Sequence, residues 1–173
     1  MIPETQRKLS EALFFFKLLY SRTEGPASDV EEFGYFLSAF LSAARSVTWV
    51  LQAEEKDRYD AWYPAWKARL AQAEQQLWHF MNEQRVAEVH QDGADVTATV
   101  EWRPVRKILG MQGRALAHSI IVGPPGSPPV EEGVPIHHFR IGDRVVDVRD
   151  ACATYLNLLD ALVKEFITAH TTV

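Results

Sequence analysis

The chain has 173 residues, of which 47% are hydrophobic and 24% charged, a composition typical of one soluble globular domain. Its formal net charge of −5 argues against a surface that binds nucleic acid indiscriminately. No apolar run approaches the roughly 20 residues that span a bilayer, and no segment resembles a signal peptide. We therefore expect a single cytoplasmic domain over residues 1–173 that does not enter a membrane.

The first two expected helices each carry an apolar stripe. In residues 4–22 the stripe has spacings of four, three and four. A longer helix follows Ser28-Asp29, and its apolar spacings alternate between four and three, which is typical of nearly parallel packed helices. The first stripe consists of Leu9, Leu13, Phe16 and Tyr20, and the second of Phe33, Leu37, Phe40, Ala44, Val47 and Leu51.

Arg45 lies on a neighbouring stripe of the second helix, whose other members are mostly small or polar. Small residues allow a second helix to approach closely, and a guanidinium in such a place needs a hydrogen-bond acceptor. We expect Arg45 to contact a carboxylate or a backbone carbonyl. A dimer that buries this stripe remains one alternative.

Residues 57–70 combine four aromatic side chains with Pro64, which disrupts a helix beyond its first turn. We predict a loop and a short helix there. The aromatic side chains either cover one end of the core or form a platform for base stacking, and the first alternative is favoured. They are Tyr59, Trp62, Tyr63 and Trp66.

The rest of the chain predicts a helix, a small sheet and a final helix. The helix runs from about 73 to 91, and alternating polar and apolar residues then predict a strand over 96–102. Weaker signals give a strand at 118–122, a mobile loop over 123–133 and a hairpin over 135–148 that turns at Gly142-Asp143.

The last helix covers about 148–170, with Cys152 on its apolar stripe. The predicted fold is therefore mainly α: a four-helix up-and-down bundle with a small antiparallel β insertion, residues 94–147, before the last helix.

Several familiar catalytic signatures are absent, including a glycine-rich phosphate loop, GxSxG, paired CxxC and HExxH. His137 and His138 adjoin on an expected strand, where neighbours point to opposite faces, so they do not form one metal site. His79 and Glu83 stand four residues apart, and we interpret them as a pair on a helix surface. We therefore expect no metal and no cofactor.

Arg85 and His90 are the candidate catalytic residues. They stand five apart near the end of the third long helix, in a stretch that also contains the polar residues Asn82 and Glu83. A basic segment follows, in which no carboxylate occurs between Glu101 and Glu131. Either the segment is a solvated basic face or it contacts an anion such as a phosphate. Its cationic residues are Arg103, Arg106, Lys107 and Arg114.

These features resemble the HEPN superfamily, the higher-eukaryote and prokaryote nucleotide-binding domains, whose mark is an arginine followed four to six residues later by a histidine. The resemblance covers roughly 5–91 and 148–170. It implies a homodimer in which motifs of two chains meet at one cleft, with RNA or a nucleotide and an antitoxin-like protein as partners in toxin or defence systems.

By this resemblance the chain is a metal-independent endoribonuclease. His90 would move protons during attack of an RNA 2′-hydroxyl on its phosphodiester, and Arg85 would stabilise the phosphate. Active members commonly place a small polar residue after the arginine, whereas this chain has Val86.

That departure favours the alternative, a non-catalytic HEPN-like module that binds a nucleotide, RNA or protein through Asn82, Glu83 and the basic segment. A third alternative is purely structural: Arg85 pairs with Glu83 or Glu88, and His90 caps the helix.

Overall fold

The computed structural model describes residues 2–22, 30–90, 96–104 and 131–171. These residues form a mainly helical protein with a small antiparallel sheet before the last helix, as predicted. The strand expected at 118–122 and most of the loop expected at 123–133 lie outside the described residues. The elements are α1 (Pro3–Arg22), α2 (Val30–Glu54), α3 (Lys56–Arg69), α4 (Gln72–His90), β1 (Thr97–Pro104), β2 (Glu131–Ile141), β3 (Arg144–Asp147) and α5 (Val148–Thr171).

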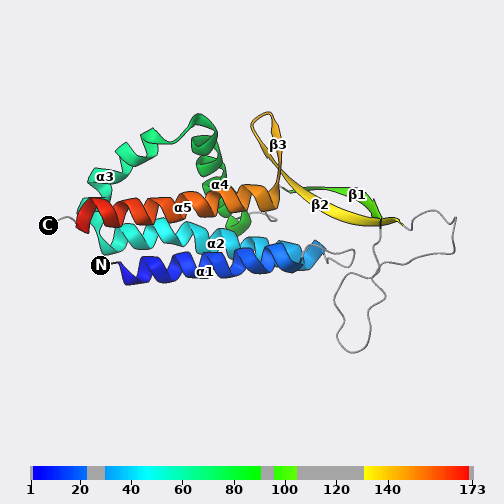
Figure 1. The fold of residues 1–173 in the computed structure, drawn as a ribbon, viewed down its shortest axis with the longest axis horizontal. Helices are drawn as coiled ribbons and strands as arrows, with labels where there is room; N and C mark the ends of the chain where they lie inside the picture. The colour runs from blue at the N-terminus through cyan, green and yellow to red at the C-terminus, as the bar shows by residue number, and fades with distance from the viewer. Residues whose placement is uncertain (1, 23–29, 91–95, 105–130, 172–173) are drawn as a thin grey trace, which may run out of the picture.

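The three longest helices lie side by side, with α2 returning along α1 and α5 running in the same direction as α2 (Figure 1). On the other side of α5 from α1, α3 and α4 form an angled pair, and α4 crosses the long helices steeply in this view.

The core is built from the predicted stripes of α2 and α5. All six apolar residues predicted for α2 are at most 3% exposed. Cys152 is fully buried in α5, and burial raises the pKa of its thiol well above its ordinary value, so it serves packing as predicted. The buried stripe of α5 consists of Val148, Cys152, Tyr155, Leu159, Leu162 and Phe166.

The buried face of α1 differs from the prediction. Leu13 and Tyr20 are 41% and 47% exposed, while Thr5, Ala12 and Leu19 are completely buried. Thr5 and Ala12 are small, so α1 and α2 can approach closely along this line, and the bulky side chains are displaced to its flanks. The sequence predicted the helix correctly but misplaced its buried face.

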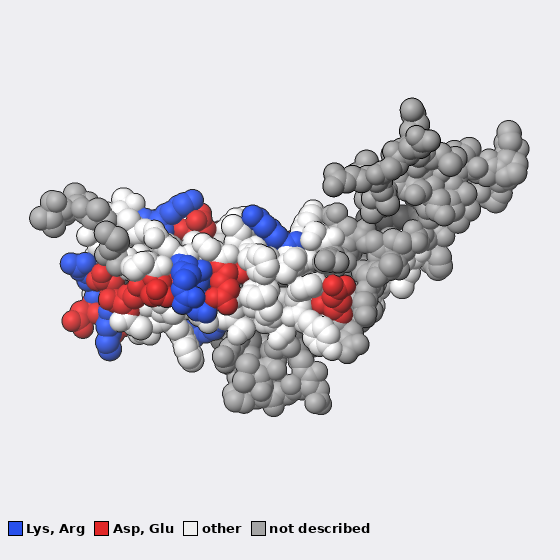
Figure 2. Space-filling view, turned by 90° about the horizontal axis from the view of Figure 1, so that it is seen from below, with Lys and Arg blue, Asp and Glu red and all other residues white. Residues whose placement is uncertain are grey.

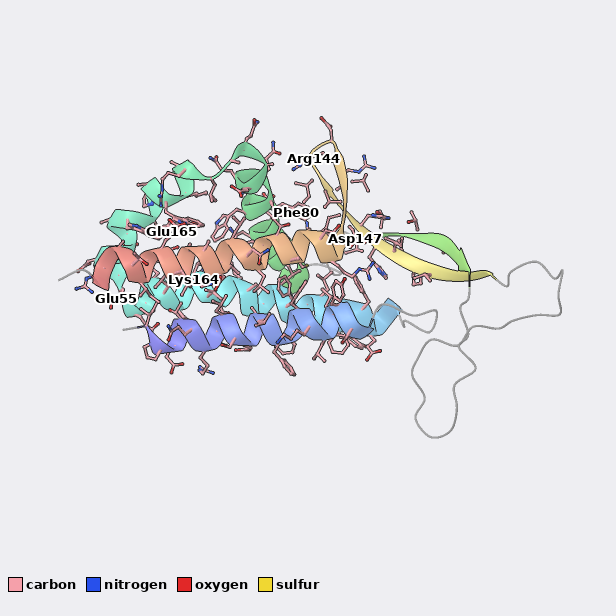
Figure 3. All side chains as sticks on the ribbon, in the orientation of Figure 1. Glu55, Phe80, Arg144, Asp147, Lys164 and Glu165 are labelled. Atoms are coloured by element: carbon pink, nitrogen blue, oxygen red, sulfur yellow. The ribbon has the colours of Figure 1, made fainter. Side chains whose placement is uncertain are left out.

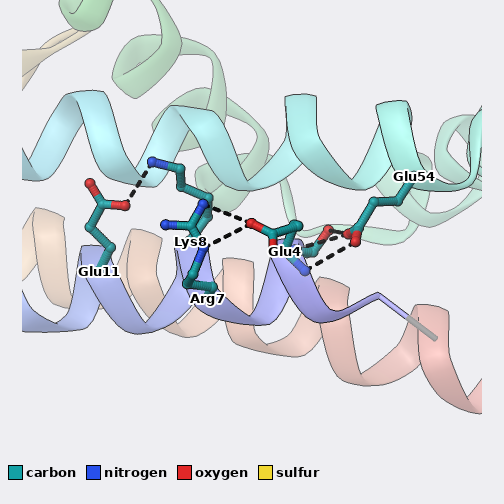
Figure 4. Close-up of polar contacts among 6 residues, drawn as sticks. Glu4, Arg7, Lys8, Glu11 and Glu54 are labelled. Carbon is teal, nitrogen blue, oxygen red and sulfur yellow. Dashed lines mark hydrogen bonds and ion pairs between the residues drawn. The ribbon is translucent and has the colours of Figure 1, made fainter.

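The start of α1 is held by a carboxylate from the end of α2 (Figure 4). Glu54 accepts hydrogen bonds from the backbone N–H groups of Glu4 and Thr5, at 3.0 and 2.9 Å, and from the Thr5 hydroxyl at 2.6 Å. Burial acts to raise the pKa of Glu54, but the hydrogen bonds outweigh it and the pKa is lowered. A negative charge on unpaired N–H groups is a favourable helix cap.

The third helix is longer than predicted, because α3 is continuous through Pro64. Proline removes one backbone hydrogen bond within a helix. Burial of Tyr59 and Trp66, and the edge contact of Trp62 with Phe166 at 5.4 Å, fix this helix against the body and offset that loss. The aromatic cluster covers one end of the core, as favoured from the sequence.

The sheet has the order β1-β2-β3, and β2 and β3 form the predicted hairpin. Gly142 has a φ of 61°, the left-handed conformation that a tight turn requires and that glycine adopts without strain. His137 and Phe139 alternate with outward-facing residues and are buried against the helices. Figure 3 shows Phe80 of α4 beside this hairpin, and its ring meets that of Phe139 at 5.0 Å.

Charged side chains on the face seen in Figure 2 gather mostly toward the end that carries the two termini. Further along α1, the apolar side chains of Leu13, Phe14 and Tyr20 are exposed. Within the described ranges, every helix is too short or too polar to cross a membrane.

Candidate functional site

A cavity of about 350 Å³ opens between α2, α3 and α4, and we call it the Arg45 cavity. It combines a guanidinium, an ammonium and a carboxylate with hydroxyl and amide groups and one exposed indole. The lining residues are Arg45, Thr48, Trp49 and Gln52 of α2, Tyr59, Asp60, Tyr63, Pro64 and Lys67 of α3, and Asn82 of α4.

Arg45 is half-buried, and its Nη1 donates a hydrogen bond of 2.7 Å to the Thr48 hydroxyl. The guanidinium carbon lies 5.3 Å from the centre of the Trp49 ring. Among the residues that the structure describes, the guanidinium makes no hydrogen bond or ion pair with a carboxylate or carbonyl, so the acceptor expected from the sequence stays a prediction. The hydrogen bond to Thr48 uses one of the five N–H donors of the guanidinium.

Three tyrosines of α3 and α5 lie close enough to Arg45 for its charge to act on their pKa values. Tyr63 accepts a 2.9 Å hydrogen bond from the Trp78 indole, and its ring stacks on Tyr59 with centroids 4.8 Å apart. Tyr155 donates to Asn82 Oδ1 at 3.3 Å. Burial raises the pKa of all three phenols, which the charge of Arg45 opposes only in part. These tyrosines therefore remain protonated at neutral pH.

Asp60 and Lys67 are the charged residues on the α3 wall. Asp60 accepts hydrogen bonds of 2.6 Å from both Lys56 and Gln52, which lower its pKa, so it remains ionised at neutral pH. Since Lys56 pairs with Asp60, Arg45 and Lys67 give the described lining of the cavity a net positive charge. Such a cavity favours a ligand with an anionic group.

The predicted site residues do not converge in the part of the chain that is described. Asn82 lines the Arg45 cavity, while Glu83 pairs with His79 at 3.2 Å on the helix surface, as the sequence suggested for that pair. Arg85 and His90 belong to the last part of α4, but their side chains are outside the description.

The basic segment is described only at its beginning. Arg103 lies in β1 opposite Glu132 of β2. Arg106, Lys107 and Arg114 lie outside the described residues, so their expected anion contact stays a prediction. Within the described residues, no group of three or more His, Cys, Asp or Glu is arranged to hold a metal ion.

The sequence indicated some of the residues that line the cavity but not that they lie together. Arg45 stood out as a charged residue on a helix stripe, and Tyr59 and Tyr63 as aromatic residues near Pro64. Trp49, Gln52 and Asp60 gave no local signal, because Asp60 meets the two α2 residues only when α3 packs on α2.

The family model described as Bacteriophage lambda protein ea47 matches residues 5–131, more than half of the chain. The chain belongs to this family. The ea47 match includes α2, α3 and α4, so it contains the described residues that line the Arg45 cavity. No curated protein and no solved structure matches the chain.

Proposed function

We propose that this member of the ea47 family is a non-catalytic binding module that holds a phosphate-bearing ligand, a nucleotide or RNA, in the Arg45 cavity. The observation that carries the proposal is the half-buried guanidinium of Arg45, which faces a polar cavity and has no carboxylate partner among the described residues. A guanidinium of this kind binds phosphate through several parallel hydrogen bonds.

The chemistry of the lining residues supports binding over proton transfer. The tyrosine pKa values are raised and that of Asp60 is lowered, so neither group titrates near neutral pH. Among the described residues that line the cavity there is no histidine. General acid–base catalysis works best with a group whose pKa lies near the working pH, and the pKa values of these tyrosines and of Asp60 are shifted away from it.

The proposal is tested by titrating the protein with inorganic phosphate and with a single-stranded RNA oligonucleotide in a calorimeter. We expect both to bind, the RNA to stay intact, and Arg45→Met to weaken binding at least about tenfold, since hydrogen bonds to charged groups are worth about 1.5–3 kcal/mol. Arg140→Met is the matched control, because it removes the same charge from an exposed position on β2. Equal binding by wild type and Arg45→Met contradicts the proposal.

A metal-independent ribonuclease of the HEPN type is the second candidate. One observation favours it: Asn82 lines the cavity, and Arg85 follows three residues later on α4, about 4.5 Å along the helix axis. In this proposal α1, α2, α4 and α5 form the HEPN-like up-and-down bundle, and two copies of α4 meet across a homodimer cleft. RNA cleavage that is lost in His90→Ala supports it, and intact RNA rejects it.

A further inference from the structure

We propose that the Arg45 cavity recognises a guanosine phosphate unit, with the phosphate on Arg45, the base stacked on Trp49 and the base edge on Asp60. This inference rests on the proposed binding function and specifies its ligand. It follows from the order of three chemical groups along the cavity.

The three groups are spaced along one wall. Arg45, Trp49 and Gln52 follow each other on α2, and seven residues of helix span about 10 Å. Gln52 hydrogen-bonds Asp60 at 2.6 Å, which places that carboxylate at the far end of the wall from Arg45. The wall therefore presents an anion-binding group (Arg45), then an aromatic ring (Trp49), then an acceptor (Asp60). A nucleotide presents its phosphate, its base face and its base edge in the same order.

Trp49 is suited to the middle position. Its side chain lines the cavity but remains 59% exposed, an unusually open position for an indole. Stacking of a base on an aromatic side chain is worth about 1–3 kcal/mol and does not depend on which base is present. Trp49 therefore accounts for affinity toward a base but not for the choice of base.

Asp60 accounts for the choice of base. Gln52 and Lys56 each bind a different oxygen of its carboxylate, which fixes the orientation of the group and leaves one acceptor site free on each oxygen. Two adjacent acceptors match guanine, which presents two neighbouring N–H donors on its pairing edge. Adenine and cytosine place a ring nitrogen acceptor beside their amino group, and this acceptor repels a carboxylate.

The test is calorimetric titration with 5′-GMP, 5′-AMP and inorganic phosphate. We expect GMP to bind at least about fivefold more tightly than AMP, the lower end of what a bidentate base contact provides. Asp60→Asn is expected to abolish this preference, because the amide replaces one of the two acceptors with a donor. Trp49→Ala is expected to weaken the binding of GMP and AMP equally.

Asp160→Asn is a closely matched control. Asp160 pairs with Lys164 at 2.6 Å across one helical turn, with side-chain exposures of 42% and 72%, against 40% and 71% for Asp60 and Lys56. Asp160→Asn removes an equivalent ion pair on α5, at a residue that is not part of the described cavity lining, so its preference for GMP should equal that of the wild type.

The outcomes separate this inference from the function on which it rests. Equal affinity for GMP and AMP, with phosphate still bound, overturns the guanine assignment alone. Absence of binding by all three probes overturns both proposals. Oligonucleotides with and without one guanosine then distinguish the source: tighter binding of the guanosine oligonucleotide than of GMP assigns RNA, and the reverse assigns a free nucleotide.

Discussion

Arg45 belongs to α2 and His137 of β2 packs on the first turn of that helix, and the surroundings of these two polar side chains differ. Arg45 borders an open cavity and donates a hydrogen bond to the Thr48 hydroxyl. His137 is 6% exposed and stacks on Phe33 with ring centroids 3.6 Å apart. Its Nε2 is buried and has no hydrogen-bond partner in the described part of the protein. Arg45 can therefore exchange water for a ligand, whereas His137 is closed to solvent and contributes only to stability.

A substitution in the buried region around His137 should cause the largest loss of stability. Phe139 is fully buried beside His137 and meets Phe80 of α4, so it joins the sheet to the helices. Phe139→Ala is expected to lower the free energy of unfolding by about 3–5 kcal/mol, because it leaves a cavity in the core. Urea denaturation measures this, and a loss below about 1 kcal/mol would show that the sheet contributes little to the fold.

A substitution in the wall of the Arg45 cavity should cause an intermediate loss of stability. Tyr63→Phe removes the acceptor for the Trp78 indole and leaves a buried N–H without its partner. The expected cost is about 1–3 kcal/mol of unfolding free energy. A Tyr63→Phe variant as stable as wild type would rule out this hydrogen bond as a support of the cavity.

Low pH should lower the stability of the protein through His137. Burial lowers the pKa of His137 below its ordinary 6.5, while the charge of Asp147 acts in the opposite direction. As the pH falls below 6.5, the unfolded chain binds a proton that the folded chain resists, so stability is full above this pH and decreases below it. Thermal melts from pH 8 to 5 should show a smaller decrease for His137→Phe than for wild type; equal decreases would assign the acid sensitivity to other groups.

The smallest stability effect is expected at Arg45 itself. Its guanidinium has a single hydrogen bond to Thr48 and no ion pair among the described residues. Arg45→Met keeps most of the aliphatic stem, so the unfolding free energy should change by less than about 1 kcal/mol. A larger loss, measured by urea denaturation, would mean that Arg45 serves the fold and would weaken the case for a binding residue.

The sequence predicted elements whose signal is local. The alternating three and four spacings of α2 and α5 identify their buried faces, and Gly142-Asp143 identifies the hairpin. The buried face of α1 was misplaced because two small residues, Thr5 and Ala12, decide how closely it packs on α2. Pro64 indicated a break in α3, and only tertiary contacts of its aromatic neighbours keep that helix continuous.

The site was less predictable for the same reason. Arg45 attracted attention as a charge on a helix stripe, but the absence of a carboxylate partner depends on how α3 and α4 pack. Asp60 and Trp49 come from different helices, and neither has a sequence pattern that indicates binding. The cavity is a product of packing, so it could be recognised only in three dimensions.

The most direct test of the central claim is a calorimetric titration of wild type and Arg45→Met with 5′-GMP, together with the unfolding free energy of both proteins. We predict that wild type binds GMP and that Arg45→Met binds it at least about tenfold more weakly while remaining equally stable. If Arg45→Met binds GMP as tightly as wild type does, the Arg45 cavity is not the ligand site.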